Sequence, residues 1–272
     1  MSLKKSLLIV SISLLASCDR KPATHSGPFL IRDGVTYDQK TNEPVTGIIA
    51  NYHESGELSE MITLVAGRRK GLYEAYFPDG TILLRVTYKV SDEGMTSRYA
   101  EKYHHDGSLS EKTLYKDGKK NGLTESYYES GQLFRRQTFV NGKKKGLSET
   151  YHPNGQLKQS AVFKDGEEDG EQKSYSIGGH LTVTAMFKKG IKQGVSKEYF
   201  PNGSLRSKKK YVNGYLSGFS EVYFRGGEVS EKTIYDSNGC PVSVKKFDKS
   251  GREIGDGKVF AFDMFDTGNP CY

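Results

Sequence analysis

Acidic and histidine side chains recur at fixed intervals along this 272-residue chain and are its clearest candidates for chemistry. A glutamate precedes a tyrosine by two residues in five places, and a histidine follows one in three: Glu74, Glu101, Glu125, Glu149, Glu221, His53, His104 and His152. Two carboxylates acting on one bond could hydrolyse a glycoside, and converging histidines could bind zinc. Either chemistry requires the groups to meet in one site, so the secondary-structure elements that position them decide whether such a site exists.

Those elements repeat with a period of 24 residues. Eight tyrosines are spaced by 24, with one spacing of 27: Tyr52, Tyr76, Tyr103, Tyr127, Tyr151, Tyr175, Tyr199 and Tyr223. A glycine follows each tyrosine by four residues, an aliphatic residue by six, and a large apolar residue by twelve. Four columns filled in every unit indicate a repeat protein.

Each unit reads as a β-hairpin. A first turn is Pro-Asp-Gly or Pro-Asn-Gly at 78–80, 153–155 and 201–203, and a second is Asp-Gly or Asn-Gly at 117–118, 141–142, 165–166 and 213–214. The predicted fold is therefore all-β, an elongated antiparallel sheet of about eight stacked hairpins. In most units a further apolar residue stands four before the tyrosine, as at Leu123 and Leu147. It shares parity with the tyrosine and with the residues six and twelve after it, so these columns should line one face, and the other face is mostly polar. With 31 glycines, 31 Tyr and Phe residues and 35% hydrophobic residues, the composition fits short strands and many turns.

This arrangement argues against catalysis and metal binding. At about 4.8 Å per strand, successive units lie about 9.6 Å apart, so His104 and His152 lie about 19 Å apart, whereas zinc ligands lie about 2 Å from the ion. The glutamates are separated in the same way. The sequence contains no G-x-S-x-G, H-E-x-x-H or P-loop motif. We therefore predict a protein that is not an enzyme and has no catalytic residue, metal or cofactor.

The N-terminus predicts export. Residues 1–17 carry Lys4 and Lys5 and then a short apolar run, as in a signal peptide. The run ends at Cys18 in Leu-Ala-Ser-Cys, which resembles the bacterial lipobox, and Asp19 resembles an inner-membrane retention signal. The resemblance implies a lipoprotein of the bacterial cell envelope, on the periplasmic face of the inner membrane if Asp19 acts as that signal. An ordinary signal peptide with a chance cysteine is the alternative. We divide the chain into signal peptide (1–17), lipid anchor and flexible tether (18–33), repeat array (34–241), and degenerate capping repeat with tail (242–272).

The repeat also resembles a known family. The pattern G-x4-Y-[YFH]-x-x-G-x-L, followed by an aromatic residue and Asn/Asp-Gly-Lys, is similar to the bacterial MORN repeat variant over roughly residues 37–254. That family is often described as YwqK-type antitoxins. The resemblance implies stacked hairpins and a binding or scaffolding role. We therefore predict an exported, lipid-anchored scaffold for protein–protein or envelope-surface binding, with an antitoxin or immunity protein as the alternative.

Two sets of residues are candidates for contacting a partner, which we expect to be a protein or an anionic envelope component. The first set comprises the aromatic residues that directly follow the repeat tyrosines: Phe77, Tyr128, Phe200 and Phe224. The second comprises basic second turns: Arg68, Arg69, Lys70, Lys143, Lys144 and Lys145. Alternatively, the aromatic residues only pack over the turn edge, and the basic turns are only solvated. A net charge of only +7 and the export signal disfavour nucleic acid. Cys240 and Cys271 are a candidate disulfide in an oxidising compartment.

Overall fold

The computed structural model describes residues 24–25, 27–90 and 96–257, and in these residues the regular elements are strands. A small hairpin pairs β2 (Phe29–Arg32) with β3 (Val35–Asp38). All other strands form one sheet of 19 strands. Its members are β1 (Thr24–His25), β4 (Gly47–Tyr52), β5 (Leu58–Val65), β6 (Arg68–Tyr76), β7 (Ile82–Val90), β8 (Thr96–Tyr103), β9 (Leu109–Lys116), β10 (Lys119–Tyr127), β11 (Leu133–Val140), β12 (Lys143–Tyr151), β13 (Leu157–Lys164), β14 (Glu167–Tyr175), β15 (Leu181–Lys188), β16 (Ile191–Tyr199), β17 (Leu205–Val212), β18 (Tyr215–Tyr223), β19 (Val229–Tyr235), β20 (Pro241–Phe247) and β21 (Glu253–Gly257).

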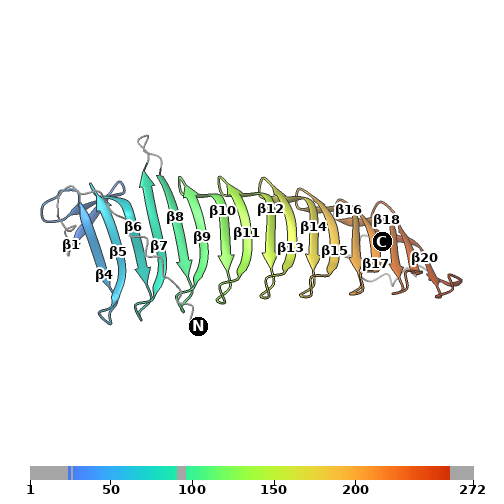
Figure 1. Ribbon diagram of the computed structural model, residues 1–272. Helices are drawn as coiled ribbons and strands as arrows, with labels where there is room; N and C mark the ends of the chain where they lie inside the picture. Colours follow the sequence, from blue (N-terminus) through green and yellow to red (C-terminus); the bar gives the residue numbers. More distant parts are fainter. Residues whose placement is uncertain (1–23, 26, 91–95, 258–272) are drawn as a thin grey trace, which may run out of the picture.

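The sheet is a linear array of consecutive hairpins (Figure 1). From β4 to β21 each strand pairs antiparallel with the next strand along the chain, while β1 adds to β4 in parallel. Each repeat tyrosine is the last residue of its strand, at the first-turn edge of the sheet. The predicted all-β fold of stacked hairpins is thus confirmed.

Both turns follow the predicted chemistry. In the first turn, Gly155 adopts a φ of +84° and donates its N–H to the carbonyl of His152, closing a type I turn with a glycine in the left-handed region. In the second turn, both central residues have positive φ, for example Asn141 at +50° and Gly142 at +83°. That is the type I′ turn, which matches the twist of the flanking strands and favours Asn-Gly.

The predicted single apolar face is wrong. Each unit contains a one-residue bulge just after the first turn, where Phe134 is left unpaired because Tyr127 pairs with Leu133 and Ser126 with Arg135. Most units contain a second bulge before the tyrosine, in which three residues around a glycine such as Gly146 lie opposite one residue of the neighbouring strand. Because a one-residue bulge reverses which face the following side chains take, the tyrosines and the large residues twelve positions later lie on opposite faces. We call these the tyrosine face and the aromatic–lysine face.

The most buried column of the array holds small side chains rather than the large apolar ones. It lies three residues before and ten residues after each tyrosine, on the aromatic–lysine face, flanked by longer side chains of that same face. Its buried members are Val86, Ala100, Thr113, Thr124, Gln137, Ala161, Ala185, Ser196, Ser220 and Thr233. In a single-layer sheet only neighbouring side chains exclude water, so short side chains between long ones become the most covered.

The two ends of the array are built differently. At the N-terminal end Val45, Ile49 and Leu64 form a buried cluster against which Phe29 of β2 packs, so part of the predicted tether region 18–33 is strand. At the C-terminal end β20 and β21 form a ninth hairpin with Phe247 in the tyrosine column, opposite Glu253. Cys240 is disulfide-bonded. Cys271, the signal peptide and Cys18 lie outside the described residues, so the predicted pairing and lipidation stay predictions.

Candidate binding faces of the sheet

The tyrosine face carries alternating charges along the N-terminal half of the array. Where a glutamate stands two residues before a tyrosine, it lies beside residues of the neighbouring strands that come nine residues after the previous or the same tyrosine and are mostly basic. We call this row the charge ladder; its N-terminal half runs Glu74, Arg85, Glu101, Lys112, Glu125, Arg136 and Glu149. Lys112 lies 2.7 Å from Glu125, and Arg136 forms an ion pair with Glu149. Four of the five glutamates considered above for catalysis thus form ion pairs across the strands, and Glu101 accepts a hydrogen bond from Tyr103.

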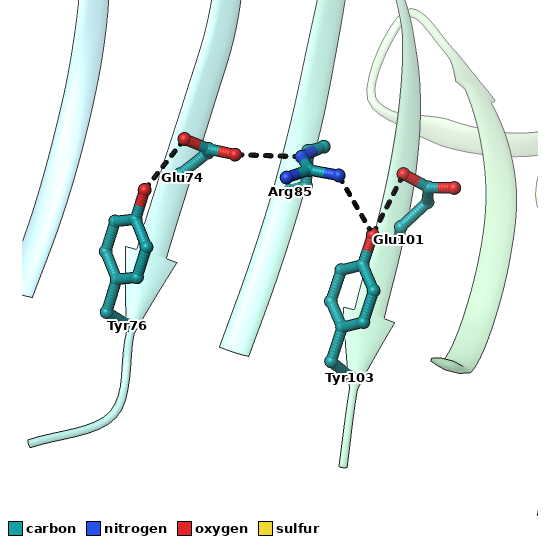
Figure 2. A network of polar contacts seen from close by, with 5 residues as sticks. All are labelled: Glu74, Tyr76, Arg85, Glu101 and Tyr103. Atoms are coloured by element: carbon teal, nitrogen blue, oxygen red, sulfur yellow. Dashed lines mark hydrogen bonds and ion pairs between the residues drawn. The ribbon is translucent and has the colours of Figure 1, made fainter. Parts of the chain in front are cut away.

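The repeat tyrosines join this ladder through their hydroxyl groups (Figure 2). Tyr76 donates its O–H to Glu74 at 2.7 Å, and the other carboxylate oxygen of Glu74 accepts a bond from Arg85 at 2.8 Å. Arg85 also reaches the hydroxyl of Tyr103, which donates to Glu101. Burial, and secondly the bond to Glu74, raise the pKa of Tyr76 to about 12. The hydroxyl therefore stays a hydrogen-bond donor at neutral pH and is no candidate for a general base.

A row of exposed apolar side chains runs beside the ladder on the tyrosine face. It holds those residues four before and eleven after the tyrosines that are apolar, and polar residues such as Glu171 and Lys210 interrupt it. Leu123 is 49% exposed and Leu147 is 50% exposed. The residues four before the tyrosines were predicted to pack in the apolar stripe, but the open sheet leaves these two largely in solvent. Together the ladder and this row give the tyrosine face alternating charge next to apolar surface.

The aromatic–lysine face stacks basic side chains over rings. Lys144 lies 4.6 Å from the ring centroid of Phe163, and Lys192 lies 4.4 Å from that of Tyr211. Burial lowers the pKa of Lys192. Among the candidate basic-turn residues, Lys144 is thus engaged within the sheet, while Lys143 and Lys145 are exposed at the turn. Arg69 lies over the ring of Tyr73, with Arg68 and Lys70 exposed on either side.

The second-turn edge is held together by backbone bonds between units. Gly142 donates its N–H to the carbonyl of Lys120, and Gly166 donates to that of Lys144, at 2.8 and 3.0 Å. Each turn therefore rests on the preceding one, and the basic turns at 119–120 and 143–145 precede the acidic turn at 167–169 along one edge. The charge along this edge therefore changes from basic to acidic between the turns at 143–145 and 167–169.

The residues that directly follow the tyrosines connect the first turns. The Nε2–H of His104 donates to the carbonyl of Tyr127 at 3.0 Å, and the hydroxyl of Tyr128 donates to that of Tyr151 at 2.8 Å. Each of these side chains thus bridges to the next unit. Among the other candidates in the column, Phe77 packs on His105, Phe200 lies beneath Arg225, and Phe224 shares the turn position.

One shallow apolar hollow opens at this edge around Tyr128. Phe134, whose ring meets that of Tyr128 edge-on, lines it with His104 and Pro153 in a space of about 450 Å³. Within the described part of the chain, no group of three or more His, Cys, Asp or Glu side chains is placed to hold a metal ion. No helix of the described residues is long and apolar enough to cross a membrane.

The comparison with solved structures gives only distant likenesses. A mutant of TarM from S. aureus, in complex with Fondaparinux, alpha-GlcNAc-glycerol and UDP, is 14% identical over 36% of this chain, with a TM-score of 0.27. The complex TcdB2-TccC3-Cdc42 is 12% identical over 82% of this chain, with a TM-score of 0.22. The match spans only 19% and 13% of those two chains. Comparison with curated proteins found no match.

The comparison with family models is informative about the repeat. The model described as MORN repeat variant matches residues 69–89, 120–141, 144–165 and 192–213. Each matched segment covers one first turn and most of the strands on either side of it, as in β12 and β13. The array is thus a repeat scaffold in which four segments match the MORN repeat variant.

Proposed function

We propose that this protein is an exported, lipid-anchored scaffold that binds a partner protein through its sheet and carries out no catalysis. The observation that carries this proposal is the tyrosine face, a long open surface on which a charge ladder runs beside exposed apolar side chains such as Leu123 and Leu147. Exposed apolar surface rimmed by polar groups is typical of interaction sites. Repeat proteins commonly bind through such extended surfaces.

The absence of converging groups supports the non-catalytic part of the proposal. Carboxylates of the ladder such as Glu125 and Glu149 form ion pairs with cations of neighbouring strands, and the histidines of the first turns bond to backbone carbonyls. Catalysis uses several groups that meet around one reacting atom. In the described residues the repeated groups are instead distributed along the array.

The anchor is proposed from the lipobox-like sequence that ends at Cys18. A Cys18→Ser variant expressed in a Gram-negative host should lose incorporation of labelled fatty acid and leave the membrane fraction. The wild-type chain should keep both properties. If the Cys18→Ser variant stays in the membrane fraction, the anchor does not depend on this cysteine, and this part of the proposal fails.

Partner binding can be tested in the native cells with a photo-crosslinking amino acid. Placed at Leu147 on the tyrosine face, it should give one discrete adduct, and placed at exposed Lys145 on the second-turn edge it serves as the matched control. Adducts from neither position would contradict a binding role. An adduct with a toxin that acts in the envelope would make the protein an immunity protein rather than a scaffold.

A further inference from the structure

The charge ladder loses its carboxylates in the middle of the array. Between Glu149 and Glu221 its successive positions are Ser160, Lys173, Thr184, Lys197 and Lys208. Thr184 pairs with Lys173 on one side and Lys197 on the other, and Lys197 pairs with Lys208. Four neighbouring strands, β14 to β17, thus present Lys, Thr, Lys and Lys side by side on the tyrosine face. The N-terminal half of the ladder places a carboxylate at every second position.

The lysines of this segment are poorly neutralised within the sheet. In the described part of the chain, Lys197 has no ion pair or hydrogen bond. Lys208 lies 3.9 Å from Glu221, a carboxylate that Lys232 approaches more closely, at 3.3 Å. Lys173 is held by Glu171 at 2.9 Å. The segment therefore has an excess of positive charge centred on Lys197.

The tyrosine hydroxyls of the same two units are also free. Where a glutamate precedes the tyrosine by two residues, the hydroxyl donates to it, as from Tyr151 to Glu149 and from Tyr223 to Glu221. At Tyr175 and Tyr199 that position holds a lysine, and neither hydroxyl has a hydrogen bond among the described residues. The break in the ladder thus leaves hydroxyl donors beside ammonium donors, a combination that suits an anionic ligand with several acceptor oxygens.

Apolar side chains flank this positive segment on both sides. Leu181 and Leu205 lie opposite Tyr175 and Tyr199 on the first-turn side. On the other side Met186, 43% exposed, and Val195 pair with Glu171 and Lys210, so this flank is apolar in its two central strands only. From Lys173 to Lys208 the segment spans three strand spacings, about 14 Å, which four or five residues of an extended peptide cover. A peptide that alternates carboxylates with apolar residues would contact both the lysines and their flanks, whereas a phosphate or sugar polymer would leave the flanks exposed.

We propose that the tyrosine face of β14 to β17 is a docking site for an extended acidic polypeptide segment with interspersed apolar residues, centred on Lys197. This inference rests on the proposed binding function and names the site and the chemistry of the partner. Positive residues in a row raise the local concentration of an acidic segment and orient it, and the apolar flanks discriminate it from other polyanions.

The test measures binding of a fluorescent peptide of alternating Glu and Leu to the purified chain without its signal peptide. Lys197→Glu restores the alternation of charge beside Lys208, so it should keep the fold and weaken binding at least tenfold. Lys145→Glu, the same reversal of charge at an exposed residue of the second-turn edge, is the matched control and should change binding less than twofold. Tyr199→Phe, which removes only a hydroxyl, should weaken binding by a smaller factor than Lys197→Glu.

Specificity for a polypeptide is tested with three further probes. A Gln and Leu peptide should not bind, and neither inorganic phosphate nor vesicles containing anionic phospholipid should displace the Glu and Leu peptide at matched charge concentration. If the Lys197→Glu variant binds the Glu and Leu peptide with the affinity of the wild-type chain, the site is wrong. If phosphate or vesicles displace the peptide fully, the assignment of the site to a polypeptide is wrong. If cross-linking from Leu147 still yields a partner in that case, the scaffold function stands and only this site falls.

Discussion

The glycines that lie in the second bulge of successive units give a sharp test of the geometry of that bulge. Gly146 and Gly170 occupy the same position in successive units, five residues before the tyrosine. Gly146 has a φ of +75°, and a Cβ added there would meet nothing within 4 Å. Gly170 has a φ of +141°, and its Cβ would lie 2.9 Å from the Cβ of Val162. Alanine is strained at both positions, but it collides with a neighbour only at the second.

The magnitudes separate the two substitutions. Gly146→Ala should lower the free energy of unfolding by about 1–2 kcal/mol, the cost of a left-handed backbone with a Cβ. Gly170→Ala adds an overpacking cost of about 1–3 kcal/mol, so its total should be about 2–5 kcal/mol. Gly255→Ala, at a glycine without positive φ or near neighbours, is the control and should stay within about 0.5 kcal/mol.

Urea unfolding followed by circular dichroism measures these differences. Adding Val162→Gly to Gly170→Ala should recover part of the loss, because it removes the Cβ with which the new methyl group collides, whereas adding it to Gly146→Ala should recover nothing. A double-mutant cycle then gives a coupling energy that belongs to the contact. If Gly170→Ala costs no more than Gly146→Ala, or if Val162→Gly rescues neither, the bulge geometry described above is wrong.

Three other predictions concern charge and burial. The hydrogen bond from Lys112 is the main cause of the lowered pKa of Glu125, so the stability that this ion pair contributes is present above the ordinary pKa of 4.5 and is lost as the pH falls through the folded value. Glu125→Gln should therefore flatten the fall in the urea midpoint between pH 5 and pH 3. An unchanged dependence of the urea midpoint on pH would contradict this. Gln137 is fully buried and its Oε1 has no partner among the described residues. Gln137→Met should therefore leave the free energy of unfolding unchanged or raise it by up to about 1 kcal/mol, which a thermal melt would show as an equal or higher melting temperature. A large loss of stability would show that the amide is needed. Burial beside Tyr211 lowers the pKa of Lys192. Lys192→Met should therefore leave the melting temperature at pH 7 unchanged or raise it. A clearly lower melting temperature would mean that the cation–ring contact contributes more stability than the burial of the ammonium group costs.

The sequence predicted the hairpins, their order and both turn types because these depend on local chemistry. An Asn-Gly pair such as Asn141 and Gly142 favours the positive φ values of a type I′ turn, and this preference depends on the two residues themselves rather than on tertiary contacts. The exchange of faces could not be read in the same way, because a bulge is defined by the pairing of two strands. The extra residue of the bulge that exchanges the faces, such as Phe134 or Lys158, also differs in type from unit to unit, so no repeated residue marks it.

The binding surface was predicted less well for a related reason. The glutamate column was visible in the sequence, but its cations come from neighbouring strands and are found only once the register is known. The register places Arg85 beside Glu74 and leaves Lys197 without a carboxylate. The aromatic residues that follow the tyrosines, such as Tyr128, proved to bond to backbone carbonyls of the next unit, because the turns stack more closely than the sequence alone could show.

The nearest-neighbour pairing of the hairpins has a consequence for how the chain acquires its structure. From β5 onward every strand forms backbone hydrogen bonds with the strand that precedes it in the chain. The strand pairings of the array therefore join segments that are close in the sequence. The cluster of Val45, Ile49 and Leu64 offers a first folded template, onto which each newly emerged hairpin can add in turn. A chain that leaves a translocation channel in an extended form can thus fold vectorially, one 24-residue step at a time, with a single growing edge exposed to misassembly at any moment.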